Sequence, residues 1–344
     1  MRNERGTARV RVPLRVDFVG MSDLRPFCDD YGGAVLNANI ARWLQVRVTI
    51  RQDARLVVSA PDISLDPREY ENVEALADDS DAALTAEILK ALEWTQGLDI
   101  QTYLEMPRGA GLGSSSAYTV GLLVAINALK GYPRTNMELA AMAMDIEERA
   151  LHVHYGWQDQ ISPLLPAGLR FLEVSKRAAP FQFQFERLPT SEQTIETVER
   201  RALLCFTGAS RSAGVVLRDV LDRFTAREPA TVNALRKLSD MARVLRVALI
   251  SDDMAAVGPI LTETWAAHCA LSPAVTTRQI DYLLSFGAEN GAEAGRVCGA
   301  GGGGTLMFWS RDGRDYLLRQ ALISQGYQVF RLGLDGAALG CWLE

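Results

Sequence analysis

Residues 107–117 read P-R-G-A-G-L-G-S-S-S-A, so three glycines stand directly before three serines and an apolar, helix-like pattern. A strand-like stretch, 98–105, precedes them. A strand, glycine loop and helix in this order expose backbone N–H groups at the positive end of a helix dipole, and glycine lets that backbone approach a phosphate closely. The segment therefore predicts a polyphosphate site. A glycine turn capped by one serine is the simpler alternative, but three serines supply more oxygens than one cap requires.

Two common nucleotide-binding motifs do not fit this segment. Its glycines, Gly109, Gly111 and Gly113, do not follow G-x-G-x-x-G, and no lysine follows Gly113 as a P-loop requires. A second glycine-rich segment, V-C-G-A-G-G-G-G-T-L-M-F at 297–308, does contain the dinucleotide string. It precedes a strand-like pattern instead of opening a helix, so the context of a dinucleotide site is missing.

Charge and composition exclude several classes of protein. The formal net charge of −6 argues against a nucleic-acid surface, and no apolar run long enough for a membrane span or a secretion signal is present. The five cysteines lie far apart without a C-x-x-C pair, which is typical of reduced thiols and makes structural zinc improbable. We expect a cytoplasmic protein that binds neither nucleic acid nor membrane; a homodimer stays open.

The order of strand-like and helix-like segments predicts an α+β chain in two parts, 1–190 and 191–344. Thr135 and Glu138 form a capping box at the start of one helix. The patterns predict strands at 8–19, 98–105 and 327–330, and helices at 82–96, 115–130, 212–225, 229–250, 252–268 and 275–288.

The motif at 107–117 closely resembles the P-x-x-x-G-L-G-S-S-A motif of the GHMP kinases, the superfamily of galactokinase, homoserine kinase, mevalonate kinase and phosphomevalonate kinase. The segment R-V-P-L-R-V-D-F-V-G-M-S-D-L near the N-terminus is similar to the first motif of that family, and 297–308 to the third. The resemblance implies a two-domain fold: an N-terminal ATP-binding part like ribosomal protein S5 domain 2, and a helix-rich C-terminal α/β sandwich.

The resemblance also implies ATP and Mg²⁺ as cofactors. Ser115 stands where the family coordinates magnesium. Glu148, eleven residues before Asp159, matches the spacing of metal ligand and catalytic aspartate in mevalonate-kinase-like members, while its neighbour Glu147 remains an alternative. The residues expected to contact the nucleotide are Pro107, Gly109, Gly111, Gly113, Ser114, Ser115 and Ser116.

Two residues are expected to act on the acceptor hydroxyl. Asp159 in G-W-Q-D-Q matches the catalytic base or proton acceptor of the family, although it could also cap a helical turn. Arg15 matches the first-motif arginine that lies near the reacting hydroxyl in galactokinase-like members; an exposed strand arginine is the alternative.

Other segments resemble D-glycero-D-manno-heptose 7-phosphate kinases and fucokinases, which implies phosphorylation of an anomeric hydroxyl. Chain length favours the heptose kinases, whereas Trp157 resembles the fucokinase form. Arg25 and Arg211 are candidates for binding a phosphate on the acceptor. A catalytically silent sugar- or nucleotide-binding regulator is a non-enzyme alternative. The residues expected to bind the acceptor are Ser22, Asp23, Gly33, Gln158, Arg211, Gly301 and Gly302.

Overall fold

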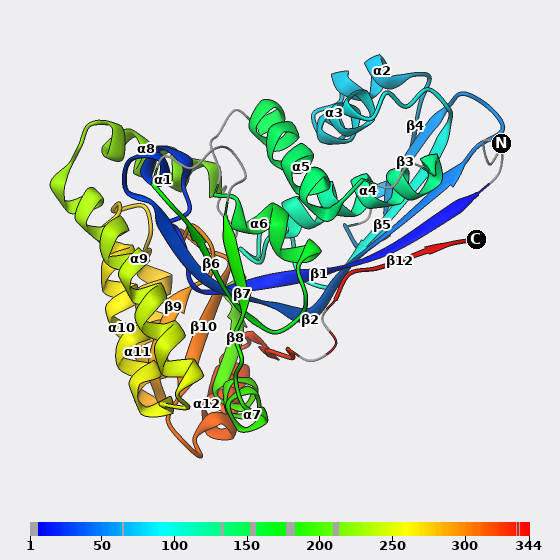
Figure 1. Ribbon diagram of the computed structural model, residues 1–344. Helices are drawn as coiled ribbons and strands as arrows, with labels where there is room; N and C mark the ends of the chain where they lie inside the picture. The colour runs from blue at the N-terminus through cyan, green and yellow to red at the C-terminus, as the bar shows by residue number, and fades with distance from the viewer. Residues whose placement is uncertain are drawn as a thin grey trace.

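The computed structural model describes residues 6–63, 65–131, 134–151, 156–176, 183–208, 213–334, 336 and 338–344. The chain forms two parts, each with its own sheet, and the two longest strands run from one part into the other (Figure 1). This is the two-part α+β architecture that the sequence predicts.

The larger sheet has eight strands, in the order β12-β1-β2-β5-β3-β4, with β6 paired to β2 and β7 paired to β6. The antiparallel pair β1–β2 is its spine and carries a register shift between Pro13 and Leu14. Proline cannot donate a ladder hydrogen bond, which accounts for an irregularity there. The strands are β1 (Thr7–Val19), β2 (Gly33–Ile50), β3 (Leu56–Ala60), β4 (Leu65–Tyr70), β5 (Leu98–Leu104), β6 (Leu169–Val174), β7 (Gln184–Arg187) and β12 (Gly340–Leu343).

Helices cover one face of this sheet. The central one, α4 (Ser114–Lys130), packs on β1 and β2, and a Cβ at Gly121 would stand only 2.8 Å from the methyl groups of Val12 and Val46. Glycine therefore brings α4 close to the sheet and fixes where its N-terminus points. The other helices here are α2 (Val73–Asp78), α3 (Ala83–Ala91), α5 (Asn136–Leu151) and α6 (Gln158–Ile161). The capping box of α5 is confirmed by paired Thr135–Glu138 hydrogen bonds.

The smaller sheet has the order β11-β8-β10-β9 and alternates its side chains between two cores. On β10, Leu306 and Phe308 pack with α11 and α12, whereas Met307 and Trp309 face the larger core. This period of two is that of a strand buried on both faces. The elements are β8 (Ala202–Phe206), β9 (Ala292–Val297), β10 (Thr305–Ser310), β11 (Gln328–Arg331), α7 (Glu192–Arg201), α8 (Ala213–Thr225), α9 (Pro229–Ile250), α10 (Met254–Cys269), α11 (Arg278–Glu289) and α12 (Asp315–Ser324).

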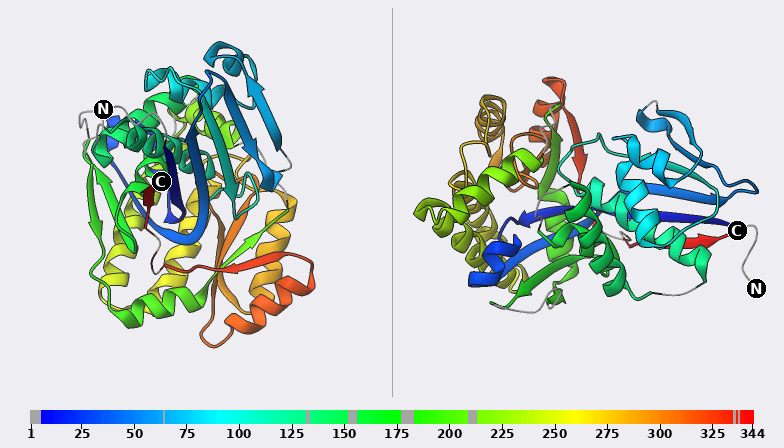
Figure 2. Two further views of the ribbon diagram at one scale, coloured as in Figure 1. Left: turned by 90° about the vertical axis from the view of Figure 1, so that its right-hand side faces the viewer. Right: turned by 90° about the horizontal axis from the view of Figure 1, so that it is seen from above.

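The C-terminus returns to the first sheet. Strand β12 pairs antiparallel with β1, and Thr7 and Glu344 exchange backbone hydrogen bonds, so the last strand lies beside the first (Figure 2). Every strand of the smaller sheet comes after residue 190, but β12 belongs to the larger one. Strand β12 is therefore the one strand after residue 190 of the described chain that does not belong to the smaller sheet.

All five cysteines are free thiols. Within the described ranges, no helix is both long and apolar enough to cross a membrane.

Candidate active site

The two glycine-rich segments lie directly against one another, although the chain separates them by more than half its length. The backbone N–H of Thr305 donates to the carbonyl of Ala110 at 2.9 Å. A Cβ at Gly111 would stand 2.8 Å from the Cys298 carbonyl oxygen, and one at Gly304 2.9 Å from the Ala110 oxygen. Both glycines have φ values in the left-handed region. Glycine is therefore required at both positions for the two loops to make this contact, and not only for a ligand to approach.

The first glycine loop ends at the N-terminus of α4. Gly113 is the cap residue, in the left-handed conformation with φ 73°, and no side chain caps the helix. Ser115 is exposed, while Ser116 is buried and donates from its hydroxyl to Glu147 Oε2 at 2.8 Å. The free N–H groups and the exposed hydroxyl of Ser115 thus face the space in front of the helix, where the dipole favours an anion.

Glu147 lies on α5, behind the serines. Its Oε2 also accepts from Gln160 Nε2 at 2.7 Å, while its Oε1 is buried and has no hydrogen-bond partner among the described residues. Burial raises the pKa of Glu147 to about 7. A buried carboxylate oxygen left without a donor fits a cation ligand, since Mg²⁺ binds oxygen donors. Glu147 lines the pocket described below; Glu148, the residue that the spacing favoured, does not.

Asp159 opens α6 and is held by Arg15 of β1. Arg15 Nε donates to Asp159 Oδ1 at 2.7 Å and Arg15 Nη2 to Oδ2 at 2.8 Å, which is a bidentate pair. The Arg15 side chain is 5% exposed and that of Asp159 is 27% exposed. A buried guanidinium therefore holds a carboxylate that is partly open to solvent. Burial alone would lower the pKa of Arg15, but the charge and hydrogen bonds of Asp159, together with the charge of Asp17, outweigh it and raise that pKa. Arg15 is therefore not an exposed strand arginine.

Behind Arg15, a buried network of hydrogen-bonded side chains extends to the second glycine loop. Asp17 accepts from Arg15 Nη1 at 3.4 Å, from Arg296 Nη2 at 2.9 Å and from the backbone N–H of Gly299 at 2.8 Å. Burial opposes ionisation of Asp17, but the Arg296 and Arg15 charges outweigh it and lower the pKa of Asp17. His268 completes the chain: burial lowers its pKa to about 3, and its ring contacts Arg296 and the Ala300 carbonyl.

Another carboxylate, that of Asp23, lines the pocket beside Asp159. Its Oδ2 accepts from the backbone N–H of Gln158 at 3.1 Å, and its Oδ1 from Gln158 Nε2 at 3.4 Å. Burial raises the pKa of Asp23 to about 7, against the effect of these hydrogen bonds. A Cβ at Gly156 would stand 2.0 Å from Asp23 Oδ2, so only glycine allows this approach.

These groups enclose one pocket of about 320 Å³ at the junction of the two parts, a volume that suits a small ligand. Ten of the residues that the sequence nominated line it: Arg15, Asp23, Gly109, Gly111, Gly113, Ser114, Ser115, Ser116, Gln158 and Asp159. Residues that the sequence did not nominate for the site also line it: Met21, Leu24, Gly156, Gly214, Leu217, Gly299 and Ala300.

Other nominated residues do not line this pocket. Pro107 lies at the start of the first loop, where its carbonyl accepts from Ala110. Ser22 is fully buried and bonds the Ala34 carbonyl, and a Cβ at Gly33 would overlap the Ser22 carbonyl, so this pair supports the backbone near Asp23. Gly301 and Gly302 pack against Val275. Arg211 lies outside the described residues.

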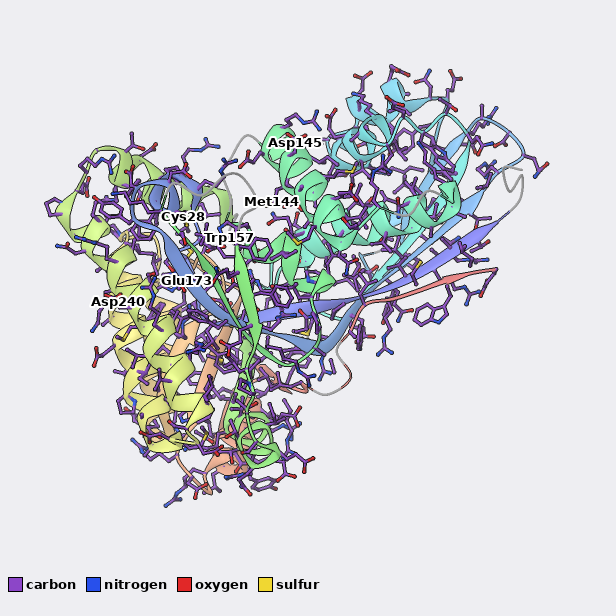
Figure 3. The ribbon with its side chains drawn as sticks, in the orientation of Figure 1. Cys28, Met144, Asp145, Trp157, Glu173 and Asp240 are labelled. Atoms are coloured by element: carbon purple, nitrogen blue, oxygen red, sulfur yellow. The ribbon has the colours of Figure 1, made fainter. Side chains whose placement is uncertain are left out.

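Trp157 is buried and does not line the pocket. Its ring stacks on Phe183 with centroids 5.2 Å apart, and it lies beside Cys28 of α1 (Arg25–Tyr31), as Figure 3 shows. The residue therefore supports the position of Gln158 and Asp159, which follow it, and it does not contact the space in which an acceptor would lie.

Comparison with known proteins identifies the family. Residues 81–165 match the model of the GHMP kinases N-terminal domain, and residues 245–328 match that of the GHMP kinases C-terminal domain. The chain is 28% identical over 342 residues to the D-glycero-alpha-D-manno-heptose 7-phosphate kinase of Campylobacter jejuni, covering 96% of this chain and 98% of that protein. It is 30% identical over 319 residues to the bifunctional fucokinase/GDP-fucose pyrophosphorylase of Arabidopsis thaliana, covering 88% of this chain but only 30% of that protein's length.

A solved structure supports the fold. The crystal structure of a D-glycero-D-manno-heptose 1-phosphate kinase from Bacteroides thetaiotaomicron superposes with a TM-score of 0.79 at 23% sequence identity, covering 97% of this chain and 98% of that one. Both family domains are thus present in order, with the loops and the helix N-terminus that their motifs encode. The chain belongs to the GHMP kinases, a family of ATP-dependent phosphotransferases.

Proposed function

We propose that the protein is a sugar kinase that transfers the γ-phosphate of ATP to the anomeric hydroxyl of a sugar, with D-glycero-D-manno-heptose 7-phosphate or a related heptose phosphate as its acceptor. The observation that carries this proposal is the bidentate Arg15–Asp159 pair, which presents a carboxylate to the same pocket as the N-terminus of α4. Phosphoryl transfer needs an oriented acceptor hydroxyl close to bound phosphates. The Asp159 carboxylate can orient the hydroxyl, and the N-terminus of α4 can bind the phosphates.

The residues divide into three roles. The N–H groups of the first glycine loop and of α4 bind the phosphates of ATP. Ser115 and Glu147 would hold Mg²⁺, which would supply positive charge to offset that of the phosphates; Glu147 takes the place of Glu148 because it lines the pocket. Asp159 orients the acceptor hydroxyl and accepts its proton, while Arg15 fixes the carboxylate in position.

Asp23 and Gln158 bind the sugar. A carboxylate accepts hydrogen bonds from hydroxyl groups, and both residues line the pocket beside Asp159. The heptose acceptor is supported by the relative that matches over nearly its whole length. L-fucose is the second candidate, supported by the fucokinase relative. Trp157 gives no support to fucose through a sugar contact, because its ring is buried against Phe183. We propose a cytoplasmic location, where ATP is abundant.

The test is a screen for ADP formation with ATP and Mg²⁺ over heptose 7-phosphates, L-fucose, galactose and hexosamines, followed by assignment of the phosphorylated carbon by NMR. We expect one sugar to be preferred and its anomeric carbon to carry the phosphate. Phosphate on another carbon would contradict the anomeric assignment. Sugar or nucleotide binding without ADP formation from any acceptor would support the silent regulator instead.

A further inference from the structure

Arg170 of β6 is a buried cation without an acidic partner. Its side chain has no solvent exposure, and no carboxylate accepts from it within the part of the chain that the structure describes. Burial lowers its pKa to about 9, which still leaves the guanidinium protonated at neutral pH. Burying a charge is costly, and an apolar residue of similar volume would fill this space without that cost. Packing alone therefore does not explain an arginine here.

The guanidinium is held by five hydrogen bonds, all to neutral oxygens. Arg170 Nη1 donates to the carbonyls of Ser162 at 2.9 Å and Pro166 at 3.2 Å. Arg170 Nε and Nη2 donate to Asn37 Oδ1 at 3.2 and 3.0 Å, and Nη2 also donates to Asn39 Oδ1 at 2.8 Å. Guanidinium can only donate hydrogen bonds. The carboxamide of Asn37 is thus obliged to turn its oxygen toward Arg170 and its nitrogen away.

The orientation of Asn37 determines that of Gln158. Asn37 Nδ2 donates to Gln158 Oε1 at 3.2 Å and to the hydroxyl of Ser162 at 3.0 Å. Because the oxygen of the Gln158 carboxamide accepts from Asn37, its nitrogen faces the other way, toward Asp23 Oδ1 at 3.4 Å. Arg170 therefore determines which way the carboxamide of Asn37 points, and Asn37 determines which way that of Gln158 points. Gln158 lines the pocket.

Asp23 is the end of this chain. It accepts from Gln158 at both oxygens, through the side-chain amide and the backbone N–H. Burial raises the pKa of Asp23 to about 7, but both hydrogen bonds from Gln158 favour the ionised form, so Asp23 is a carboxylate above that pH. Asp23 lines the pocket, so its remaining lone pairs can accept a hydrogen bond from a ligand there.

We infer that Arg170 is a positioning residue which, through Asn37 and Gln158, fixes Asp23 as a hydrogen-bond acceptor for a hydroxyl group of the acceptor substrate. This inference rests on the proposed function, because it takes the ligand of the pocket to be a polyol. It also states a specificity: the group bound at Asp23 must donate. Above about pH 7, where Asp23 is ionised, a phosphate or carboxylate of the substrate is disfavoured there, since it would place an anion against an anion.

The decisive variant is Asn37→Asp. It keeps the side-chain volume and gives Arg170 a carboxylate, but it replaces the Asn37 donor with an acceptor. Gln158 then turns its nitrogen toward residue 37 and its oxygen toward Asp23. We expect the KM for the acceptor sugar to rise about tenfold, as for the loss of one hydrogen bond to a charged group. The KM for ATP should stay within about twofold, and the acidic limb of kcat/KM for the sugar should move to higher pH by about one unit.

The matched control is Asn39→Asp, which adds the same charge beside Arg170 at a residue that donates to the Ser162 carbonyl. It should leave the acceptor KM and the acidic limb unchanged. Arg170→Lys and Arg170→Met form a second pair: lysine keeps a donor-only cation and should keep the acceptor KM within about threefold, whereas methionine removes the donor and should raise it about tenfold. Wild-type acceptor KM and pH profile in folded Asn37→Asp and Arg170→Met would overturn the inference.

A measurement without turnover separates this inference from the proposed function. The carboxyl signal of Asp23 in a ¹³C-labelled protein, assigned by its loss in Asp23→Asn, can be titrated in wild type and in Asn37→Asp. We expect its midpoint to lie higher in Asn37→Asp. If no sugar is phosphorylated but the midpoint shifts, the proposed function is wrong and the inferred role of Arg170 is supported. If a sugar is phosphorylated and the midpoint does not move, the inferred role of Arg170 is wrong and the proposed function is supported.

Discussion

Arg296 of β9 donates to Asp17 of β1 at 2.9 Å, and both side chains are buried. The pair joins the two sheets at the point where the second glycine loop leaves β9. Since Asp17 also contacts Arg15 and the N–H of Gly299, one carboxylate fixes both the arginine that holds Asp159 and the start of the loop that lies against the first glycine segment. The site therefore depends on a buried ion pair that does not itself line the pocket.

Asp17→Asn should destabilise the fold strongly. It leaves two buried arginines facing a neutral amide, and breaking a buried pair costs about 3 kcal/mol. We expect the free energy of unfolding in urea to fall by about that amount.

The control for this change is Asp81→Asn, because Asp81 pairs with Arg68 at the surface with 64% of its side chain exposed. It should change the free energy of unfolding by less than about 1 kcal/mol. Equal effects of the two substitutions would mean that the Asp17–Arg296 pair does not join the sheets as described.

His268 should make the protein sensitive to acid. Its pKa is about 3 in the fold and 6.5 when the chain is unfolded, so between these values the unfolded chain binds a proton that the folded one does not. Stability therefore falls as the pH drops through this window, by up to about 1.4 kcal/mol per unit from this residue. Asp23 and Glu147, with a pKa of about 7 in the fold, act in the opposite direction from about pH 7 down to about pH 4.

The difference between wild type and His268→Gln isolates the histidine, because the two acids are present in both. Urea unfolding from pH 6.5 to 4.5 should show a smaller loss of stability on acidification in His268→Gln. Parallel pH dependences would exclude His268 as the cause.

Glu147→Gln should raise the magnesium concentration required for half-maximal activity by about tenfold or more, since it removes a charged oxygen ligand. Because burial raises the pKa of Glu147 to about 7, the magnesium affinity of the wild type should increase as the pH rises through 7. Glu148→Gln is the matched control and should leave the metal titration unchanged. The opposite result for the two variants would return the ligand role to Glu148.

Asp159→Asn should lower kcat by about two to four powers of ten while ATP binding stays nearly intact, because the amide cannot accept the hydroxyl proton. Asp145→Asn is a control on the solvent side of α5, where the Asp145 side chain is 66% exposed (Figure 3). Calorimetry with ATP and single-turnover assays measure the two properties separately. Full activity of Asp159→Asn would reject the catalytic assignment.

Gly111→Ala should impair ATP binding beyond the strain of its backbone. Gly111 and Gly131 have φ values of 73° and 68°, so alanine at either costs about 1 kcal/mol. Only at Gly111 would the new Cβ stand 2.8 Å from the Cys298 carbonyl; at Gly131 nothing lies within 4 Å. We expect a higher KM for ATP in Gly111→Ala and an unchanged one in Gly131→Ala. Identical KM values would show that the loop contact has no effect on the nucleotide site.

Local pattern was sufficient for the elements that carry the motifs. The helix expected at 115–130 is α4, and the helices expected at 229–250 and 275–288 are α9 and α11. Helical periodicity over many residues is a strong signal. The sequence did not predict several short elements, because a short element shows few periods of its pattern: strands β3, β4, β8, β9 and β12 and helices α1, α2, α6, α7 and α12. β12 in particular is defined by its pairing with β1, which no local pattern of four residues reveals.

The sequence by itself determined the family, the glycine loop before α4 and most of the residues that line the pocket, because glycines, serines and carboxylates at fixed spacing reflect chemistry that is local in the chain. The tertiary structure decided which of Glu147 and Glu148 faces the pocket, since neighbours on a helix point in different directions. Only the tertiary structure shows that Asp17 contacts Arg296, and that Arg170 is connected to Asp23 through Asn37 and Gln158. A buried charge has to find its partners across strands that lie far apart in the chain, and spacing in the sequence does not record that distance.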